Sequence, residues 1–195
     1  MYVNLFMLLS LLIVVLYSTL KYFSRRKIVT LTEYDASVLK LLSILCLIEK
    51  DTPSWIYNVT LVMYAIGDVV IIWNQSISLI FFQVGHLFFL SAYFQQNVYY
   101  EYILPIFAVL TFSIHYFLIY RNPKLCDKPY EYILYWMYIF VLQCFLIVPV
   151  LHGYYGTIPF ILSDISIGFQ LDIVHLYEYP LYYVSLLYLR WVYIC

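Results

Sequence analysis

The stretch "YAIGDVVIIW", residues 64–73, places a carboxylate, Asp68, inside a run of apolar residues. A second stretch, "IPFILSDISIGF", residues 158–169, repeats the pattern with Asp164. A charged side chain in the middle of a membrane costs at least about 2.5–3.5 kcal/mol, so such residues usually face the interior of a helix bundle and mark a functional site. The two aspartates are therefore the first candidates for such a site.

The composition of the chain is that of an integral membrane protein. Of its 195 residues, 65% are hydrophobic and only 11% are charged, whereas about 25% of the residues in a soluble domain are charged. A membrane-spanning helix needs about 20 predominantly apolar residues, and eight segments are candidates: 2–20, 36–49, 54–73, 77–95, 101–120, 131–149, 155–172 and 178–194. The sequence predicts an all-α, polytopic membrane helix bundle, with residues 1–195 forming a single transmembrane domain.

Basic residues in the connections predict the orientation of this bundle. Seven of them fall on one side of eight alternating helices: Lys21, Arg25, Arg26, Lys27, Arg121, Lys124 and Lys128. The connections on the other side contain only Lys50. Because basic connections remain in the cytoplasm, we expect both termini to face the lumen or the exterior. The predicted location is a eukaryotic endomembrane, such as the endoplasmic reticulum, or the plasma membrane.

Four ionisable residues in four different segments fall in the cytoplasmic half of the predicted bundle. At a helical rise of about 1.5 Å per residue, Lys40 and Asp68 lie about 6 and 7 Å inside the cytoplasmic edge. Asp164 and His86 lie about 12 and 13 Å inside it by the same rise. Their similar depth predicts one polar cavity that opens toward the cytoplasmic leaflet. Two carboxylates in such a site repel each other, so one can keep its proton as an acid while the other stays ionised.

Structural roles account for the same residues. Asp68 can hydrogen-bond a neighbouring helix or form an ion pair with Lys40. A lone histidine within the membrane, such as His86, is more often a packing residue than a ligand. The tyrosine-rich stretch at 177–193 is typical of interfacial belts and aromatic packing, and the sequence assigns it no chemistry.

Nothing in the sequence points to a cofactor or to a nucleic acid. The four histidines fall in separate segments and connections, which disfavours a zinc site: His86, His115, His152 and His175. The sequence has neither a glycine-rich phosphate loop nor a G-x-S-x-G nucleophile motif. A net charge of −1 gives no general attraction for nucleic acid. We therefore predict no metal and no other cofactor, and the predicted partners are lipids.

The motifs around the two aspartates resemble those of the lysoplasmalogenase (YhhN-like) membrane family. The paired-helix signature of that family is similar to "MYAIGDVVIIW" followed by "VGHLFFLSAYF". Its second signature is similar to "IPFILSDISIGFQ", and its second helix, which begins with a lysine, resembles "LKLLSILCLI". The order of the motifs and the eight-helix count agree as well. The resemblance covers roughly residues 36–194, and Tyr64 stands where the family tends to have a small residue.

The resemblance implies hydrolysis of the vinyl ether bond of a lysoplasmalogen, which yields a fatty aldehyde and glycerophosphoethanolamine or glycerophosphocholine. It implies Asp68 and Asp164 as the catalytic acid–base pair. We expect Asp164, the deeper of the two, to be the acid, because burial favours a protonated carboxyl group. The expected substrate-binding residues are Lys40, which can hold the lipid phosphate, His86 and Tyr64. The alternatives are a hydrolase of another lipid bond and a transporter or other non-enzymatic multi-pass protein.

Overall fold

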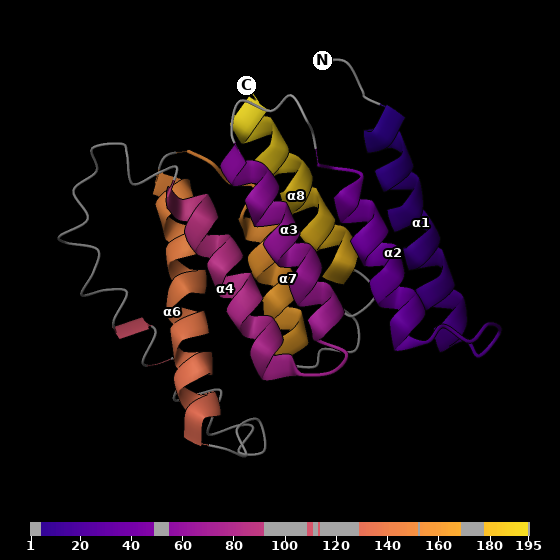
Figure 1. The fold of residues 1–195 in the computed structure, drawn as a ribbon, viewed down its shortest axis with the longest axis horizontal. Coiled ribbons are helices and arrows are strands. Elements are labelled where there is room, and N and C mark those ends of the chain that lie inside the picture. Colours follow the sequence, from indigo (N-terminus) through magenta and orange to yellow (C-terminus); the bar gives the residue numbers. More distant parts are fainter. Residues whose placement is uncertain are drawn as a thin grey trace.

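The computed structural model describes residues 5–48, 55–91, 109–110, 113, 129–151, 153–168 and 178–194, and these residues form helices and their connections (Figure 1). The helices are α1 (Leu5–Arg25), α2 (Glu33–Leu45), α3 (Trp55–Val70), α4 (Gln75–Ser91), α6 (Pro129–Leu151), α7 (Ile158–Gly168) and α8 (Glu178–Ile194). The predicted all-α class is confirmed for the described part of the chain. The predicted segment 101–120 lies outside the described residues, apart from 109–110 and 113.

Two of the helices are long and apolar enough to cross a membrane by themselves, Leu5–Arg25 and Tyr130–Val150. Helices α3 and α4 are apolar but shorter. Two spanning helices of this kind are compatible with a membrane location, and they leave the predicted number of eight spans open. The described part of α7 is also shorter than the predicted segment 155–172, since the residues that follow Gly168 lie outside the description.

The start of α2 shows how local sequence fixes a helix boundary. Thr32 is the N-cap, and its hydroxyl accepts a hydrogen bond from the backbone N–H of Asp35 at 3.1 Å. The Asp35 carboxylate in turn accepts from the backbone N–H of Thr32 at 3.1 Å. This capping box satisfies two N–H groups at the helix start. The helix therefore begins at Glu33, three residues before the predicted apolar segment.

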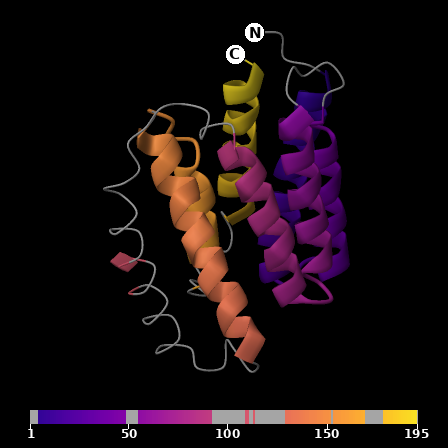
Figure 2. The same ribbon diagram turned by 60° about the vertical axis from the view of Figure 1, so that its left-hand side comes forward.

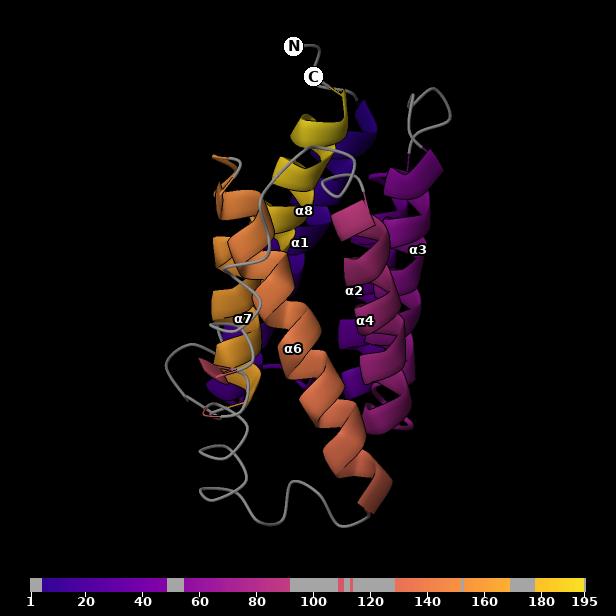
Figure 3. The same cartoon turned by 90° about the vertical axis from the view of Figure 1, so that its left-hand side faces the viewer.

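The helices pack side by side in an order that brings distant segments together. Helix α2 lies between α1 and α3, α3 packs along α4, α4 packs along α6, and α7 packs along α8. Helix α8 also contacts α1 and α3. The turned views in Figure 2 and Figure 3 show α6 on the flank of the bundle, beside α4. One hydrophobic core runs through the bundle, and its largest group of aromatic rings lies where α3, α4, α6, α7 and α8 meet.

Aromatic rings fill that core, and Phe160 of α7 lies at its centre. Its fully buried ring packs against His86 at 4.8 Å and against Tyr182 at 4.9 Å between ring centroids. Phe145 and Tyr64 complete the shell, at 5.2 and 5.4 Å. Buried aromatic rings carry large apolar areas and prefer such tilted contacts. This packing positions the polar groups of the same side chains.

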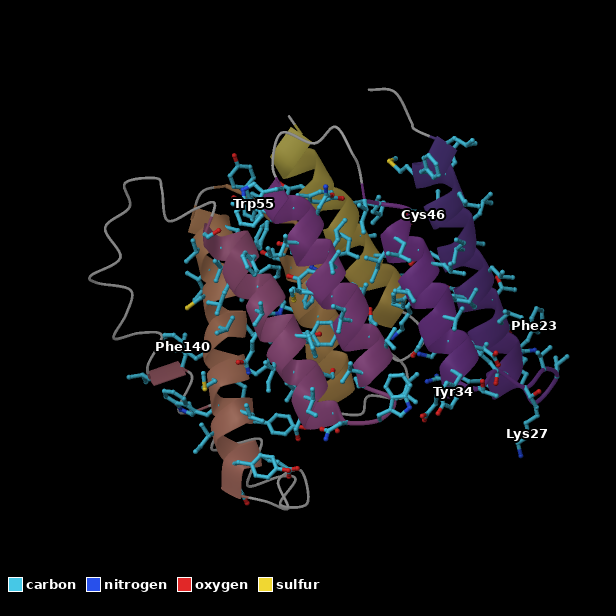
Figure 4. All side chains as sticks on the ribbon, viewed as in Figure 1. Phe23, Lys27, Tyr34, Cys46, Trp55 and Phe140 are labelled. Atoms are coloured by element: carbon cyan, nitrogen blue, oxygen red, sulfur yellow. The ribbon has the colours of Figure 1, made fainter. Side chains whose placement is uncertain are left out.

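The exterior of the bundle is apolar along α1, and polar side chains lie among the apolar ones of its interior. Helix α1 exposes a nearly continuous apolar surface: Leu5, Phe6, Leu8, Leu9, Leu11, Leu12, Val15 and Leu16. Buried polar side chains lie inside, among them Ser10, Ser43, Asp68, His86 and Ser185. Figure 4 shows the labelled side chains of Trp55, Phe23 and Tyr34 at the periphery of the bundle. An apolar exterior of this extent marks a surface that contacts lipid or another partner.

Candidate functional site

Asp68 and Lys40 form an ion pair between α3 and α2. Lys40 Nζ lies 3.6 Å from Asp68 Oδ1, and Asp68 is buried, with 5% of its surface exposed. The Lys40 ammonium also lies over two tyrosine rings, 5.2 Å from the centroid of Tyr179 and 5.9 Å from that of Tyr17. A cation over an aromatic face is attracted by the ring quadrupole. The ion pair expected as the structural alternative for Asp68 is therefore present, and the Lys40 ammonium contacts a carboxylate and aromatic rings.

His86 and Tyr64 form a second polar pair, between α4 and α3. The Tyr64 hydroxyl and His86 Nδ1 are 2.7 Å apart, and both side chains are fully buried. The preceding residue makes room for this pair, because a Cβ added at Gly85 would lie 2.5 Å from the Tyr64 ring. His86 Nε2 is buried and has no hydrogen-bond partner among the described residues. The small residue Gly85 therefore lets the His86 imidazole pair with Tyr64 through Nδ1. The second ring nitrogen, Nε2, has no protein partner in the described structure.

Asp164 pairs with a neutral group, Tyr138 of α6. The Tyr138 hydroxyl donates a hydrogen bond to Asp164 Oδ2. The Tyr138 ring also packs against the His86 ring, at 6.0 Å between centroids. Asp164 is half-buried, so it is less shielded than Asp68. Their different partners distinguish the two carboxyl groups, and the expectation that Asp164 is the acid stays a prediction.

The structure brings the two aspartates into one region. Asp164 accepts a hydrogen bond from Tyr138, whose ring packs against His86. His86 in turn pairs with Tyr64, four residues before Asp68 on the same helix. The residues predicted from the sequence thus gather from four helices, α2, α3, α4 and α7, into one cluster. Their catalytic and substrate-binding roles stay predictions.

Three tyrosines of this cluster were not expected from the sequence. Tyr138 contacts Asp164, and Tyr179 covers the Lys40 ammonium. Tyr182 packs against the Tyr64 ring at 6.1 Å and interacts electrostatically with both aspartates. The only signal in the sequence was the high tyrosine content, which is shared by interfacial and core positions alike. Depth along a helix can be counted from the sequence, whereas the direction in which a tyrosine points depends on its neighbours.

The cluster contains carboxyl, imidazole, phenol and ammonium groups. Among the residues that the structure describes, no three His, Cys, Asp or Glu side chains come close enough to hold a metal ion. Comparison of the chain with protein-family models, with curated proteins and with solved structures gives no match. The functional argument therefore depends on the geometry of the cluster and on the motifs in the sequence.

Proposed function

We propose that the chain is a multi-pass membrane hydrolase that cleaves the vinyl ether bond of lysoplasmalogens. The products are a fatty aldehyde and a glycerophospho headgroup. One observation carries the proposal: two aspartates that are 96 positions apart, Asp68 on α3 and Asp164 on α7, belong to one cluster of polar and aromatic side chains and have different partners. The motif resemblance to the lysoplasmalogenase family supports the choice of substrate.

The apolar exterior supports the membrane part of the proposal. Large apolar side chains are exposed along α1, as on a surface that contacts lipid. Trp55 at the start of α3 and Trp73 just after its end are each 65% exposed. They are separated by roughly 25 Å of helical rise, close to the thickness of a bilayer core of about 30 Å. Exposed tryptophans at both ends of an apolar helix are typical of membrane interfaces. We propose eight spans, with the basic connections in the cytoplasm.

The partners of the two carboxyl groups support a division of labour. The Lys40 ammonium stabilises the ionised carboxylate of Asp68, so Asp68 suits the stabilisation of a cation. Asp164 is bonded to a phenol through Oδ2, which leaves Oδ1 to carry a proton. A vinyl ether is hydrolysed by protonation of its β-carbon, followed by capture of the oxocarbenium cation by water. Asp164 supplies that proton, and Asp68 stabilises the cation, as paired carboxyl groups do in glycoside hydrolysis.

A hydrolysis assay on the purified protein tests the substrate. The protein is given a lysoplasmalogen and, separately, an acyl lysophospholipid with the same headgroup and chain length. We expect fatty aldehyde from the first lipid and no fatty acid from the second. Fatty acid from the acyl lipid alone would identify an esterase, and the absence of product from both lipids would contradict the proposal.

The Lys40–Asp68 ion pair favours a second candidate, a non-enzymatic membrane bundle in which Asp68 is purely structural. The variant Lys40→Met/Asp68→Asn removes both charges together, so it leaves no unpaired charge in the core. If the chain is such a non-enzymatic bundle, the wild-type protein and the double variant both fold and neither forms product from either lipid. If Asp68 is catalytic, the wild-type protein releases aldehyde and the folded double variant releases none.

A further inference from the structure

Helix α8 carries three neighbouring buried tyrosines, and only two of them have hydrogen-bond partners in the described structure. The Tyr179 hydroxyl bonds across to α2, and the Tyr183 hydroxyl donates to Ser10 Oγ of α1 at 2.7 Å. The Tyr182 side chain is equally buried, yet its hydroxyl has no partner among the described residues. A buried hydroxyl without a partner destabilises a fold, so its presence calls for a physical reason.

The surroundings of Tyr182 place this hydroxyl at the candidate site. Its ring packs edge-on against Phe160 at 4.9 Å and against Tyr64 at 6.1 Å. Its ring also packs at 5.7 Å against Tyr179, which covers the Lys40 ammonium beside Asp68. A buried water molecule requires two to four polar partners. The Tyr182 O–H is one such group, and the carboxyl groups of the same cluster are candidates for the others.

We propose that Tyr182 is a water-binding residue of the active site, whose hydroxyl and neighbouring carboxyl groups hold the water that attacks the cation. The inference rests on the proposed vinyl ether hydrolysis and adds to it the source of the nucleophile. It also assigns a chemical role to a residue of the tyrosine-rich stretch at 177–193.

The reaction balances without a further reactant. Asp164 gives its proton to the β-carbon, and the π electrons of the vinyl group form the new C–H bond, which leaves an oxocarbenium cation. The water held by Tyr182 forms a C–O bond to the cation, and its released proton returns to Asp164. The hemiacetal then collapses to the aldehyde as its hydroxyl proton passes to the departing glycerol oxygen. When water is not held in place, the cation instead returns a proton to Asp164 and the substrate re-forms.

The variant Tyr182→Phe, assayed in deuterated water with an alkenyl lysophospholipid, tests this role. The substitution removes only the hydroxyl oxygen. We expect turnover to fall at least about tenfold, in line with the loss of one positioned hydrogen-bonding group. Substrate recovered before completion should carry deuterium at its vinyl β-carbon, because the cation now reverts before water captures it. Substrate recovered from the wild-type reaction should carry none.

Ser185→Ala is the matched control. It removes another fully buried hydroxyl of α8 that has no partner among the described residues, and it should keep wild-type turnover and unlabelled substrate. Tyr182→Phe should also unfold at the wild-type temperature or above it, because the hydroxyl that it removes makes no hydrogen bond to another described residue. Wild-type turnover with unlabelled substrate in Tyr182→Phe would overturn this inference alone. Failure of that variant to fold would overturn it too, and inactivity of the wild-type protein would overturn the proposed function as well.

Discussion

Two buried polar regions of the bundle contain similar side chains and differ in how completely these side chains are paired. Where α8 meets α1 and α2, every hydroxyl of the set Ser10, Ser43, Tyr179 and Tyr183 has a partner. Around Phe160, where α3, α4, α6, α7 and α8 meet, His86 Nε2 and the Tyr182 hydroxyl have none in the described structure.

The difference indicates what each region is for. A fully paired network in a low-dielectric interior fixes the positions of helices, whereas an incompletely paired one is costly unless a ligand or water completes it. The second region also contains the carboxyl groups of Asp68 and Asp164. The Lys40 ammonium contacts the Asp68 carboxylate. We interpret the α1–α2–α8 region as a structural clamp and the region around Phe160 as a binding site.

The largest losses of turnover should come from substitution of the two aspartates, and the two variants should differ in stability. Asp164→Asn keeps an oxygen that accepts from Tyr138, so we expect normal stability and a loss of turnover of at least about 100-fold. Asp68→Asn should lose turnover equally, and it should also lower the free energy of unfolding by about 1–3 kcal/mol, because the Lys40 ammonium loses its buried partner. Turnover assays and thermal unfolding in detergent separate the two effects. Wild-type turnover in either variant would show that the carboxylate is structural.

The next largest effect is expected from Gly85→Ala, which should destabilise the region around Phe160. The added Cβ would lie 2.5 Å from the Tyr64 ring, so the ring must move away from His86 at an expected cost of about 1–3 kcal/mol. Gly67→Ala is the comparison, because its Cβ would lie 3.0 Å from the edge of the Phe82 ring. We expect a smaller drop in unfolding temperature for Gly67→Ala. Equal drops would mean that the Tyr64 ring is not constrained as described.

Tyr183→Phe tests the structural clamp. The variant loses the 2.7 Å hydrogen bond to Ser10, so it should be less stable by about 1 kcal/mol. Turnover of the folded protein should stay normal, because Tyr183 belongs to the clamp. The neighbouring variant Tyr182→Phe should instead have normal stability and reduced turnover. A Tyr183→Phe variant that is stable but inactive would remove the distinction between the two regions.

The smallest effect concerns the start of α2, outside the predicted membrane segments. The hydrogen bonds from the side chain and then the backbone of Thr32 lower the pKa of the exposed Asp35 carboxyl group. Stabilisation by this group is therefore complete above the ordinary carboxyl pKa and is lost as the pH falls through the lowered value. Thr32→Ala should reduce this acid sensitivity in thermal unfolding measured between about pH 5 and 2. An unchanged pH profile would show that the capping box contributes nothing measurable.

The sequence predicted the helical class and most of the helix positions, because apolar run length reflects the physical requirement of a membrane span. It also selected Lys40, Asp68, His86 and Asp164, since a charged or imidazole side chain in such a run is costly wherever it points. These residues gather in the described structure from helices that are distant in sequence. Depth along each helix was enough to group them.

The partners of these residues could not be predicted in the same way. Which aspartate meets Lys40, and which meets Tyr138, depends on the rotation and neighbours of each helix. Tyr182 and Tyr183 are adjacent and chemically identical, yet the Tyr183 hydroxyl bonds Ser10 and the Tyr182 hydroxyl has no partner among the described residues. A tyrosine-rich sequence carries no signal that separates them, because its aromatic rings satisfy the same apolar pattern.

The central claim is tested most directly by running the reaction in deuterated water and measuring deuterium in the released aldehyde. The wild-type protein is given a lysoplasmalogen, and the released aldehyde is reduced in situ to the alcohol before its labels exchange with solvent. If Asp164 protonates the vinyl carbon, the alcohol carries one deuterium at carbon 2, and Asp164→Asn releases almost no aldehyde. Aldehyde without deuterium at carbon 2, or labelled aldehyde formed at the wild-type rate by Asp164→Asn, would contradict carboxyl-catalysed hydrolysis of the vinyl ether.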